Sequence, residues 1–468
     1  MKIKLINPSQ LDALGRPAKL NREFVTGLTL PYLAALIPGD HDIEIVEESV
    51  EKIDFDEPVD LVGITAITGR APRAYWIAEQ YRKRGVPVVM GGFHATALPH
   101  EALEHCDAVV KGEAEGIIEQ VIEDAMLGKM HGIYERKEPL SLEGLPAPRY
   151  DLINMKNFFL PVHPVQASRG CPYNCDFCSV SAFFGSHNHR KRPIDDVIRD
   201  MQKAGPYILI IDDNLMADRR YALDLFAAMK PLGKAWIGQA DIHSATDDEL
   251  MEAAAETGCR MLYIGIETLD KSALAKTGKT PNLNTDIPKA LMNLKRHHIE
   301  TFASMIIGFD EDTPESGEKI VRFCNHMRIP ILFLYILTPA PGSPMFKRMK
   351  EQGVPLKEGW HLYDGTHSVF DTASMKSHEL ETLYGEINRK VYSLSSILKR
   401  TIFPPHLLMV ILNLWARKNI KNGLHPWMGD NRWEKLVDLI PRFGKPFMSP
   451  RIRKISKLVR FTEGRFSP

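Results

Sequence analysis

Short runs rich in Ile and Val alternate with stretches of helical period through most of this chain. The first five runs are Lys2–Ile6, Asp42–Val46, Asp60–Thr65, Val86–Met90 and Asp107–Val110. Strands separated by helices pair in parallel and are covered by helices on both faces. The pattern predicts an α/β fold that begins with a doubly wound, Rossmann or flavodoxin-like domain over residues 1–135. A ligand of such a sheet lies beyond the carboxyl ends of the strands.

A second α/β series follows a proline-bearing linker, which we place at residues 136–160. Its expected strands are Val165–Ser168, Ile208–Asp212, Ala235–Gln239, Met261–Ile266, Phe302–Ile307 and Ile331–Leu337. Six strand and helix units without a fixed repeat length predict a partial (β/α)6 TIM barrel over residues 161–376. In such barrels the chemistry collects at the carboxyl ends of the strands.

The end of the chain has a different composition. Residues 395–468 hold 15 basic and 4 acidic residues, although the whole chain is neutral. We expect a basic helical extension over residues 377–468. Basic and aromatic residues together suit an anionic membrane surface or nucleic acid, and the ordinary alternative is a helical cap with a solvated face. The apolar run Leu407–Leu414 favours a membrane surface over nucleic acid.

The start of the chain shows no leader pattern, because Met1–Asn7 reads directly as a strand. The most apolar run, His406–Trp415, is only about half the roughly 20 residues that a membrane span requires. We therefore expect a cytoplasmic protein, with a peripheral position at the membrane surface as a further option.

Three of the six cysteines, Cys171, Cys175 and Cys178, lie directly after the first expected barrel strand. Iron–sulfur clusters are held by cysteine thiolates. Three thiolates on one loop can hold three irons of a 4Fe-4S cubane and leave the fourth open to a substrate. One alternative is a structural zinc site completed by His187 or His189. Another is a group of buried core cysteines.

The motif Cys171-x3-Cys175-x2-Cys178 after a strand, with Phe177 before the last cysteine, resembles the signature of the radical S-adenosylmethionine (SAM) superfamily. The resemblance implies a 4Fe-4S cluster whose open iron binds SAM. Electron transfer then cleaves SAM to a 5′-deoxyadenosyl radical that takes hydrogen from a substrate. It also implies an electron donor such as flavodoxin or ferredoxin.

The same resemblance implies SAM contacts at the ends of the later barrel strands. Asp212 to Asn214 end the second strand, Glu267 ends the fourth, and the fifth and sixth end near Gly308 and Thr338. Each residue taken singly could instead be a helix cap or a surface acid. The implied SAM-binding residues are Phe177, Asp213, Asn214, Glu267, Ile306, Gly308 and Thr338.

Over residues 1–375 the chain is similar to cobalamin-dependent radical SAM proteins. Loops with paired glycines or short polar runs follow three strands of the first domain. The implied cobalamin-binding residues are Thr65, Thr68, Gly91, Gly92, His94, Thr96 and Glu113. The Asp-x-His-x-x-Gly loop, whose histidine binds cobalt in many cobalamin domains, is absent between Asn7 and Gly27. We therefore expect no histidine beneath the cobalt. The alternative is a domain that binds nothing and braces the barrel.

These features predict a radical SAM enzyme with three cofactors, a 4Fe-4S cluster, SAM and cobalamin. The activity expected first is transfer of a methyl group from cobalamin to an unactivated carbon of a small-molecule or lipid-like substrate. A cobalamin-dependent radical cyclisation or rearrangement is the alternative within enzymes. From another class, the chain could be a zinc-stabilised nucleic-acid-binding protein. The sequence does not identify the substrate.

Overall fold

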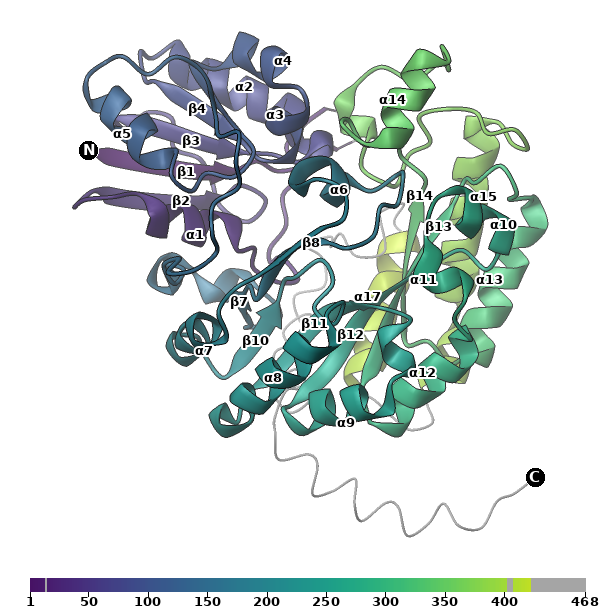
Figure 1. Cartoon of the computed structure of the whole chain (residues 1–468). Coiled ribbons are helices and arrows are strands. Elements are labelled where there is room, and N and C mark those ends of the chain that lie inside the picture. Colours follow the sequence, from purple (N-terminus) through teal and green to yellow (C-terminus); the bar gives the residue numbers. More distant parts are fainter. Residues whose placement is uncertain (13–14, 402–406, 422–468) are drawn as a thin grey trace, which may run out of the picture.

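Two six-stranded parallel sheets lie side by side in the computed structural model, which describes residues 1–12, 15–401 and 407–421 (Figure 1). The first sheet has the order β2-β1-β3-β4-β5-β6. Its strands are β1 (Lys2–Asn7), β2 (Asp42–Glu47), β3 (Leu61–Thr65), β4 (Val88–Gly91), β5 (Ala108–Lys111) and β6 (Gly132–Glu135). The order reverses between β1 and β3, which confirms the predicted doubly wound domain.

Helices cover both faces of this first sheet. They are α1 (Thr29–Leu36), α2 (Ala71–Arg82), α3 (Phe93–Ala97), α4 (Pro99–His105) and α5 (Ile118–Met126). Successive residues of a strand point to opposite faces, and β1 shows this directly. Ile6 joins the core on the face of α2, whereas Ile3 and Leu5 join the core on the face of α1 and α5.

The sixth strand of this sheet was not expected. β6 is four residues long and pairs with β5, so that Ala108 lies opposite Gly132. A run of four residues is too short to show an alternating pattern, so only the pairing identifies it as a strand.

The second sheet has the order β14-β13-β12-β11-β10-β7, with every pair parallel. Its strands are β7 (His163–Val165), β10 (Tyr207–Ile210), β11 (Ala235–Asp241), β12 (Cys259–Glu267), β13 (Glu300–Ile307) and β14 (Ile331–Ile336). Because β7 and β14 form the two edges, the barrel is open, as the sequence predicted.

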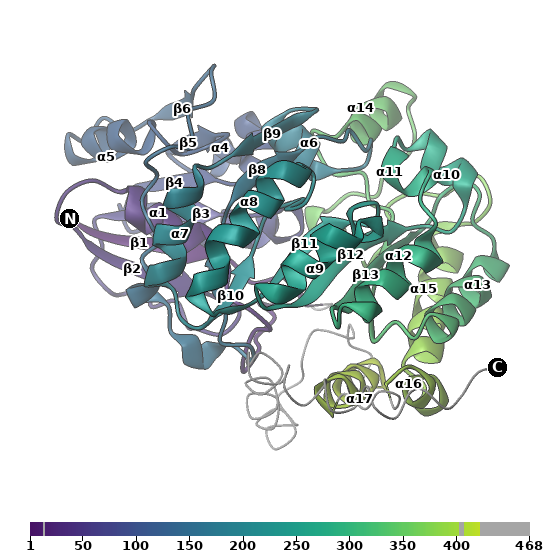
Figure 2. The same cartoon turned by 60° about the horizontal axis from the view of Figure 1, so that its bottom comes forward.

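Helices surround the outer face of this barrel (Figure 2). The short helices α10 (Lys271–Lys276), α11 (Thr280–Leu283) and α14 (Pro344–Glu351) are not among them, because they follow the carboxyl ends of β12 and β14. The covering helices are α7 (Ile194–Lys203), α8 (Arg219–Met229), α9 (Asp248–Glu256), α12 (Ile287–Arg296), α13 (Pro314–His326) and α15 (Ser377–Val391). The Ile, Leu, Met and Ala side chains between them and the strands form the largest core of the described residues.

The predicted first barrel strand, Val165–Ser168, is divided in two. β7 ends at Val165, and β8 (Ser168–Cys171) leaves the barrel to pair antiparallel with β9 (Asn188–Lys191). Gly170 makes this hairpin possible, because its φ is +77° and a Cβ there would lie 2.1 Å from the carbonyl oxygen of Asn188.

The last described helices, α16 (Leu394–Thr401) and α17 (Leu407–Lys421), lie at one end of the barrel (Figure 2). Leu408, Leu412 and Trp415 pack on residues that begin the barrel strands, such as Ala235 and Ile331. The apolar run Leu407–Leu414 therefore closes the amino-terminal end of the barrel. This corrects the expectation that the run favours a membrane surface.

Leu407 itself is exposed. The rest of the expected basic extension, from residue 422, lies outside the described residues. No helix in the described part of the chain is long and apolar enough to cross a bilayer.

Arg400 ties these helices to the barrel. Its guanidinium is buried and donates to the carbonyl oxygens of Ile329, Pro330 and Val391 and to Asn413 Oδ1, at 2.7 to 2.9 Å. Replacing it by methionine leaves buried acceptors without a donor, which costs on the order of 3 kcal/mol. We predict that Arg400→Met lowers the midpoint of thermal unfolding by several degrees.

The control is Lys399→Met, because Lys399 is exposed on the same helix. Circular dichroism against temperature compares both variants with the unchanged protein. Equal midpoints for the two variants would show that the contacts of Arg400 do not stabilise the fold.

Candidate active site

The cysteine loop lies between the two sheets, and buried hydrogen bonds fix its position (Figure 1). Cys171 ends β8, and Cys178 directly precedes α6 (Ser179–Phe184). Asp212, at the end of β10, is 1% exposed and accepts hydrogen bonds from Ala167 N at 2.7 Å and Ser168 Oγ at 2.6 Å. Burial raises the pKa of Asp212 to about 7. This carboxyl group therefore anchors the loop.

The three thiols lie close enough to influence one another. Burial raises the pKa of each, and it raises that of Cys175 to about 12. The backbone N–H of Tyr173 opposes this rise in pKa at Cys171, and the backbone N–H groups of Val180 and Ser181 oppose it at Cys178. Donors of this kind stabilise a thiolate, which is the form that binds iron.

A buried cation that the sequence did not predict lies beside these thiols. Lys279 Nζ is 2.9 Å from Glu267 Oε1, and the two side chains are 15% and 9% exposed. Burial opposes the charge of Lys279, but Glu267 and the thiols Cys175 and Cys178 raise its pKa overall. Lys279 therefore stays charged and can balance the negative charge of thiolates. Sequence reasoning missed it because a lysine in a loop normally lies on the surface.

Glu267 has an unusual backbone conformation at the end of β12. Its φ is +64°, and the pairing of β12 with β13 is irregular between Gly265 and Glu267. A Cβ on Gly265 would lie 2.3 Å from Glu267 Oε1, so only glycine leaves room for the carboxylate. Asn282 Nδ2 donates to the carbonyl oxygens of Gly265 and Ile266. A conformation this costly persists only where the surroundings enforce it, often at functional sites.

Each histidine of the zinc alternative has a ring nitrogen that hydrogen bonds to an oxygen atom. His187 Nδ1 lies 2.7 Å from the carbonyl oxygen of Pro172, and His189 Nε2 lies 3.0 Å from Ser168 Oγ. Within the described ranges, no group of three or more His, Cys, Asp or Glu side chains is arranged to hold a single metal ion. Three thiols on one loop, with N–H donors and a cation beside them, fit a cluster in which each thiolate binds its own iron.

Asn214 and Asp213 lie beside the cysteine loop, as expected for SAM contacts. Asn214 Nδ2 is 4.0 Å from Cys171 Sγ and donates to Asp241 Oδ2 at 2.9 Å. Asp213 Oδ2 accepts from Gly170 N at 3.2 Å, and burial raises the pKa of Asp213 to about 6. The structure thus brings both residues to the cluster loop, although each also holds that loop in place.

An apolar group forms the other side of this site. Phe177 and Phe309 make an edge contact with ring centroids 6.4 Å apart, and Ile306 packs in the same cluster. Gly308 has a φ of +106°, and a Cβ there would lie 2.9 Å from Leu380 Cδ2. Flat apolar surfaces of this kind suit an adenine ring.

Thr338 is turned to the backbone in this structure. Its hydroxyl donates to the carbonyl oxygen of Ile336 at 2.9 Å, so it caps the end of β14. Its contact with SAM stays a prediction.

Two tyrosines that the sequence did not single out lie within the barrel. Tyr263 on β12 and Tyr335 on β14 hydrogen bond to each other, and burial raises the pKa of both. The ring of Phe333 packs at a tilt against Tyr263, with the centroids 5.5 Å apart, which gives the interior an aromatic wall with two hydroxyl groups. Their chain positions show no motif, so only the barrel brings them together.

The expected cobalamin loops meet at the carboxyl edge of the first sheet. Gly92 has a φ of +91°, and a Cβ there would lie 2.7 Å from Thr65 Oγ1. Gly112 N donates to Thr96 Oγ1 at 2.9 Å, which ties the loops after β4 and β5 together. A Cβ added to Gly112 would meet no atom within 4 Å other than those of its chain neighbours. This open backbone can approach a large ligand closely.

His94 was expected at the cobalamin but is buried within its own domain. It is 1% exposed, and its ring nitrogens lie 3.3 Å from Thr68 Oγ1 and 2.8 Å from Tyr75 OH. Trp360, from the barrel part of the chain, makes an edge contact with it at 5.3 Å. His94 is therefore buried against Thr68, Tyr75 and Trp360 and does not face open space in this structure, whereas the expected cobalamin contact of Thr68 stays a prediction.

Glu113 is also engaged in an interdomain contact. It pairs with Arg169 and Arg190 at 2.6 and 2.7 Å. Glu113 thus joins the two domains, and because it also lines the cavity between them, its contact with cobalamin stays a prediction.

A cavity of about 340 Å³ lies between the domains at this edge. Its walls include Thr96, Gly112 and Glu113 from the first domain, together with Arg169 of β8 and Phe183 of α6. The elements that flank the cysteine loop, β8, β9 and α6, line this cavity together with the loops at the carboxyl edge of the first sheet, whereas the three cysteines do not line it. Residues on both sides fit a bulky cofactor between the two domains.

The fold and site define a radical SAM enzyme with an attached cobalamin-binding domain. The family model for the radical SAM superfamily matches residues 165–324, and that for the B12 binding domain matches residues 27–122. The chain belongs to the cobalamin-dependent radical SAM family. Its cofactors are a 4Fe-4S cluster, SAM and cobalamin.

Named relatives agree with this assignment. The chain is 30% identical over 385 residues to the bacteriochlorophyllide d C-12(1)-methyltransferase of Chlorobaculum tepidum, which covers 80% of this chain and 84% of the relative. It is 26% identical to the hopanoid C-2 methylase of Rhodopseudomonas palustris, over 69% of this chain and 64% of the relative.

A solved structure shows the same fold. The radical SAM methyltransferase TsrM from Kitasatospora setae, with tryptophan and a SAM analogue bound, superposes with a TM-score of 0.64. The match covers 98% of this chain and 99% of TsrM, with 15% sequence identity.

The position of Glu267 generates a prediction about SAM binding. Glu267→Gln keeps the shape of the side chain but removes its charge, so a hydrogen bond from SAM to a carboxylate would weaken by about 2 kcal/mol, or roughly 30-fold in affinity. Iron content should be unchanged. Calorimetric titration of anaerobically reconstituted protein with SAM measures the affinity.

Glu311→Gln is the matched control, because Glu311 pairs with Lys276 on the neighbouring surface. Unchanged SAM affinity in Glu267→Gln would show that Glu267 serves only as the partner of Lys279.

Proposed function

We propose that this protein transfers a methyl group to an unactivated carbon of a small, largely apolar substrate. The observation that carries the proposal is the interdomain cavity, which is lined on one side by the expected cobalamin loops and on the other by β8, β9 and α6, the elements that flank the cluster loop. The relatives named methyltransferases act on a bacteriochlorophyllide and a hopanoid, which are ring compounds of apolar character. Their names support the reaction type and the class of substrate.

The chain would hold each cofactor with its own group of residues. Cys171, Cys175 and Cys178 hold the cluster, and the groups beside them that suit SAM are Phe177, Asp213, Asn214, Glu267, Ile306, Gly308 and Thr338. The loops that suit cobalamin carry Thr65, Gly91, Gly92 and Thr96. Held by these residues, the cluster would supply the electron that cleaves SAM, SAM would supply the radical that takes a hydrogen atom from substrate, and cobalamin would supply the methyl group.

The barrel interior would receive the substrate. Leu408, Leu412 and Trp415 pack at the amino-terminal end of the strands, so a substrate enters at the carboxyl end, beside the cysteine loop. Deeper in the barrel, Phe333 offers an apolar surface, and Tyr263 and Tyr335 offer hydroxyl groups that can orient a polar substituent. The packing of α17 keeps water from entering at the amino-terminal end, which would help to protect a reactive carbon centre.

Two features of the cellular setting belong to the same proposal. A small electron donor such as flavodoxin or ferredoxin reduces the cluster. The enzyme works in the cytoplasm, and the 15 basic and 4 acidic residues of 395–468, rather than the apolar run Leu407–Leu414, would bring it to an anionic membrane surface that holds a lipid-like substrate. No histidine occurs between Pro8 and Leu28, which supports a cobalt without a histidine of this chain beneath it.

The experiment uses SAM with a fully deuterated methyl group, with a hopanoid and a bacteriochlorophyllide as candidate substrates. We predict that the loaded enzyme forms 5′-deoxyadenosine together with a product that carries the intact labelled methyl group, as mass spectrometry shows. Protein reconstituted without cobalamin is the control and should form no labelled product.

Cyclisation or rearrangement predicts another outcome. It would give 5′-deoxyadenosine and an altered substrate that contains no label, which would contradict the methyl transfer proposed here.

A further inference from the structure

One buried arginine joins the cluster loop to the cobalamin-binding domain. Arg169 precedes Cys171 by two residues in β8 and is 6% exposed. Its Nη1 lies 2.6 Å from Glu113 Oε1, and its Nη2 lies 2.5 Å from Glu115 Oε1. Both glutamates belong to the loop between β5 and α5, at the carboxyl edge of the first sheet. A single guanidinium therefore spans the two cofactor regions.

Further contacts tie both strands of the cluster hairpin to the same loop. Arg190, in β9, donates from Nη2 to Glu113 Oε2 at 2.7 Å. The hydroxyl of Tyr32, in α1, donates to Glu115 Oε1 at 2.6 Å, and its ring lies under Arg169. We call Arg169, Arg190, Glu113 and Glu115 the interdomain clamp.

Apolar packing already joins the domains near this point. The rings of Phe93 in α3 and Phe183 in α6 are 4.6 Å apart, and Gly342 packs between Ala97 and Ala182. Apolar contacts hold two surfaces together but tolerate small sliding, whereas the planar fork of arginine has a fixed geometry with two carboxylates. The clamp therefore adds directional control to an interface that is already closed.

We propose that the interdomain clamp is a positioning device that sets the distance between the cluster and the cobalt. Arg169 is the central positioning residue, because it lies on the same short strand as Cys171. Glu113 and Glu115 lie beside Gly112, whose open backbone faces the cavity between the domains. The inference rests on the two cofactors and not on which substrate is methylated.

The distance can be measured without turnover. In full-length protein loaded with both cofactors and reduced by dithionite, the cluster and Co(II) are both paramagnetic. The reduced cluster speeds the spin relaxation of Co(II), and this effect falls steeply with distance. Pulsed electron paramagnetic resonance measures it, with iron and cobalamin contents determined on the same sample.

We predict that Arg169→Met loads both cofactors and shows a relaxation enhancement at least about twofold smaller or more widely distributed than that of the unchanged protein, since cofactor sites need support to within about 0.5 Å. Arg169→Lys keeps the charge but cannot bridge two carboxylates with one amine, so it should show a smaller change in the same direction.

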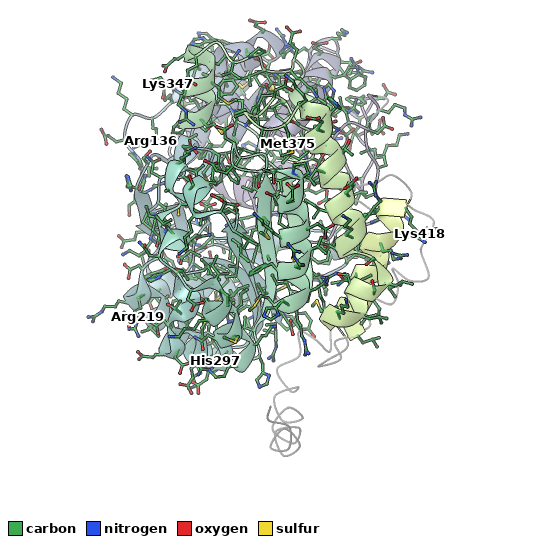
Figure 3. All side chains as sticks on the ribbon, turned by 90° about the vertical axis from the view of Figure 1, so that its right-hand side faces the viewer. Arg136, Arg219, His297, Lys347, Met375 and Lys418 are labelled. Atoms are coloured by element: carbon green, nitrogen blue, oxygen red, sulfur yellow. The ribbon has the colours of Figure 1, made fainter. Side chains whose placement is uncertain are left out.

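The matched control is Arg219→Met. Arg219 also pairs with two carboxylates, those of Asp247 and Glu249, but it lies at the outer edge of the barrel (Figure 3). Its relaxation enhancement should equal that of the unchanged protein.

Three results would overturn the proposal. The first is an unchanged enhancement in both Arg169 variants with full cofactor loading. The second is failure of both variants to load the cofactors, which would show that the clamp holds the fold itself. The third is the absence of enhancement in the unchanged protein. The third result would also refute the proposed function, which needs both cofactors close together, whereas the first two results refute only the role of the clamp.

Discussion

Buried charge holds the cysteine loop in place, and the rest of the site depends on this. Removing an ion from water costs several kcal/mol, which only close partners can offset. Each buried cation here has such partners: Arg169 meets Glu113 and Glu115, and Lys279 meets Glu267. The carboxyl group of Asp212, in turn, accepts hydrogen bonds from the loop itself. The loop can therefore present three thiols to one side while its backbone stays fixed.

The order of the two sheets explains why these partners meet. In both, every strand is parallel, so all carboxyl ends lie on one edge. Strand β8, which leads into the cysteine loop, lies between the two sheets (Figure 1), and it lines the interdomain cavity together with β9. The helices α16 and α17 close the opposite end of the barrel, which directs ligands to the side of the cysteines.

Much of the fold could be predicted from the sequence, because long Ile- and Val-rich strands carry a strong local signal. The strands β1, β12 and β13 follow the expected runs closely. β6 and the hairpin of β8 and β9 were missed. β6 is only four residues long, and β8 and β9 hold few residues of high β propensity. These segments become strands through distant pairing, helped in the hairpin by the positive φ of Gly170.

The residues of the site divide in the same way, into those that the sequence predicts and those that only the fold brings together. The spacing of the three cysteines carries its meaning within eight residues, so the cluster motif was visible in the sequence. Lys279 and Tyr335 were not, because a buried lysine or an interior tyrosine is defined by neighbours far along the chain. His94 and Glu113 have the residue types of ligand contacts but make contacts between the domains. Residue type alone could not separate these roles.

The most direct test of this account examines the iron that no cysteine holds. Reduced protein would be mixed with SAM labelled with ¹⁵N in its amino group or ¹⁷O in its carboxylate, and electron nuclear double resonance would be recorded. The account predicts coupling of both labels to one iron of a four-iron cluster. Absence of that coupling in a sample with a complete cluster, with all four irons bound by protein side chains, would contradict it.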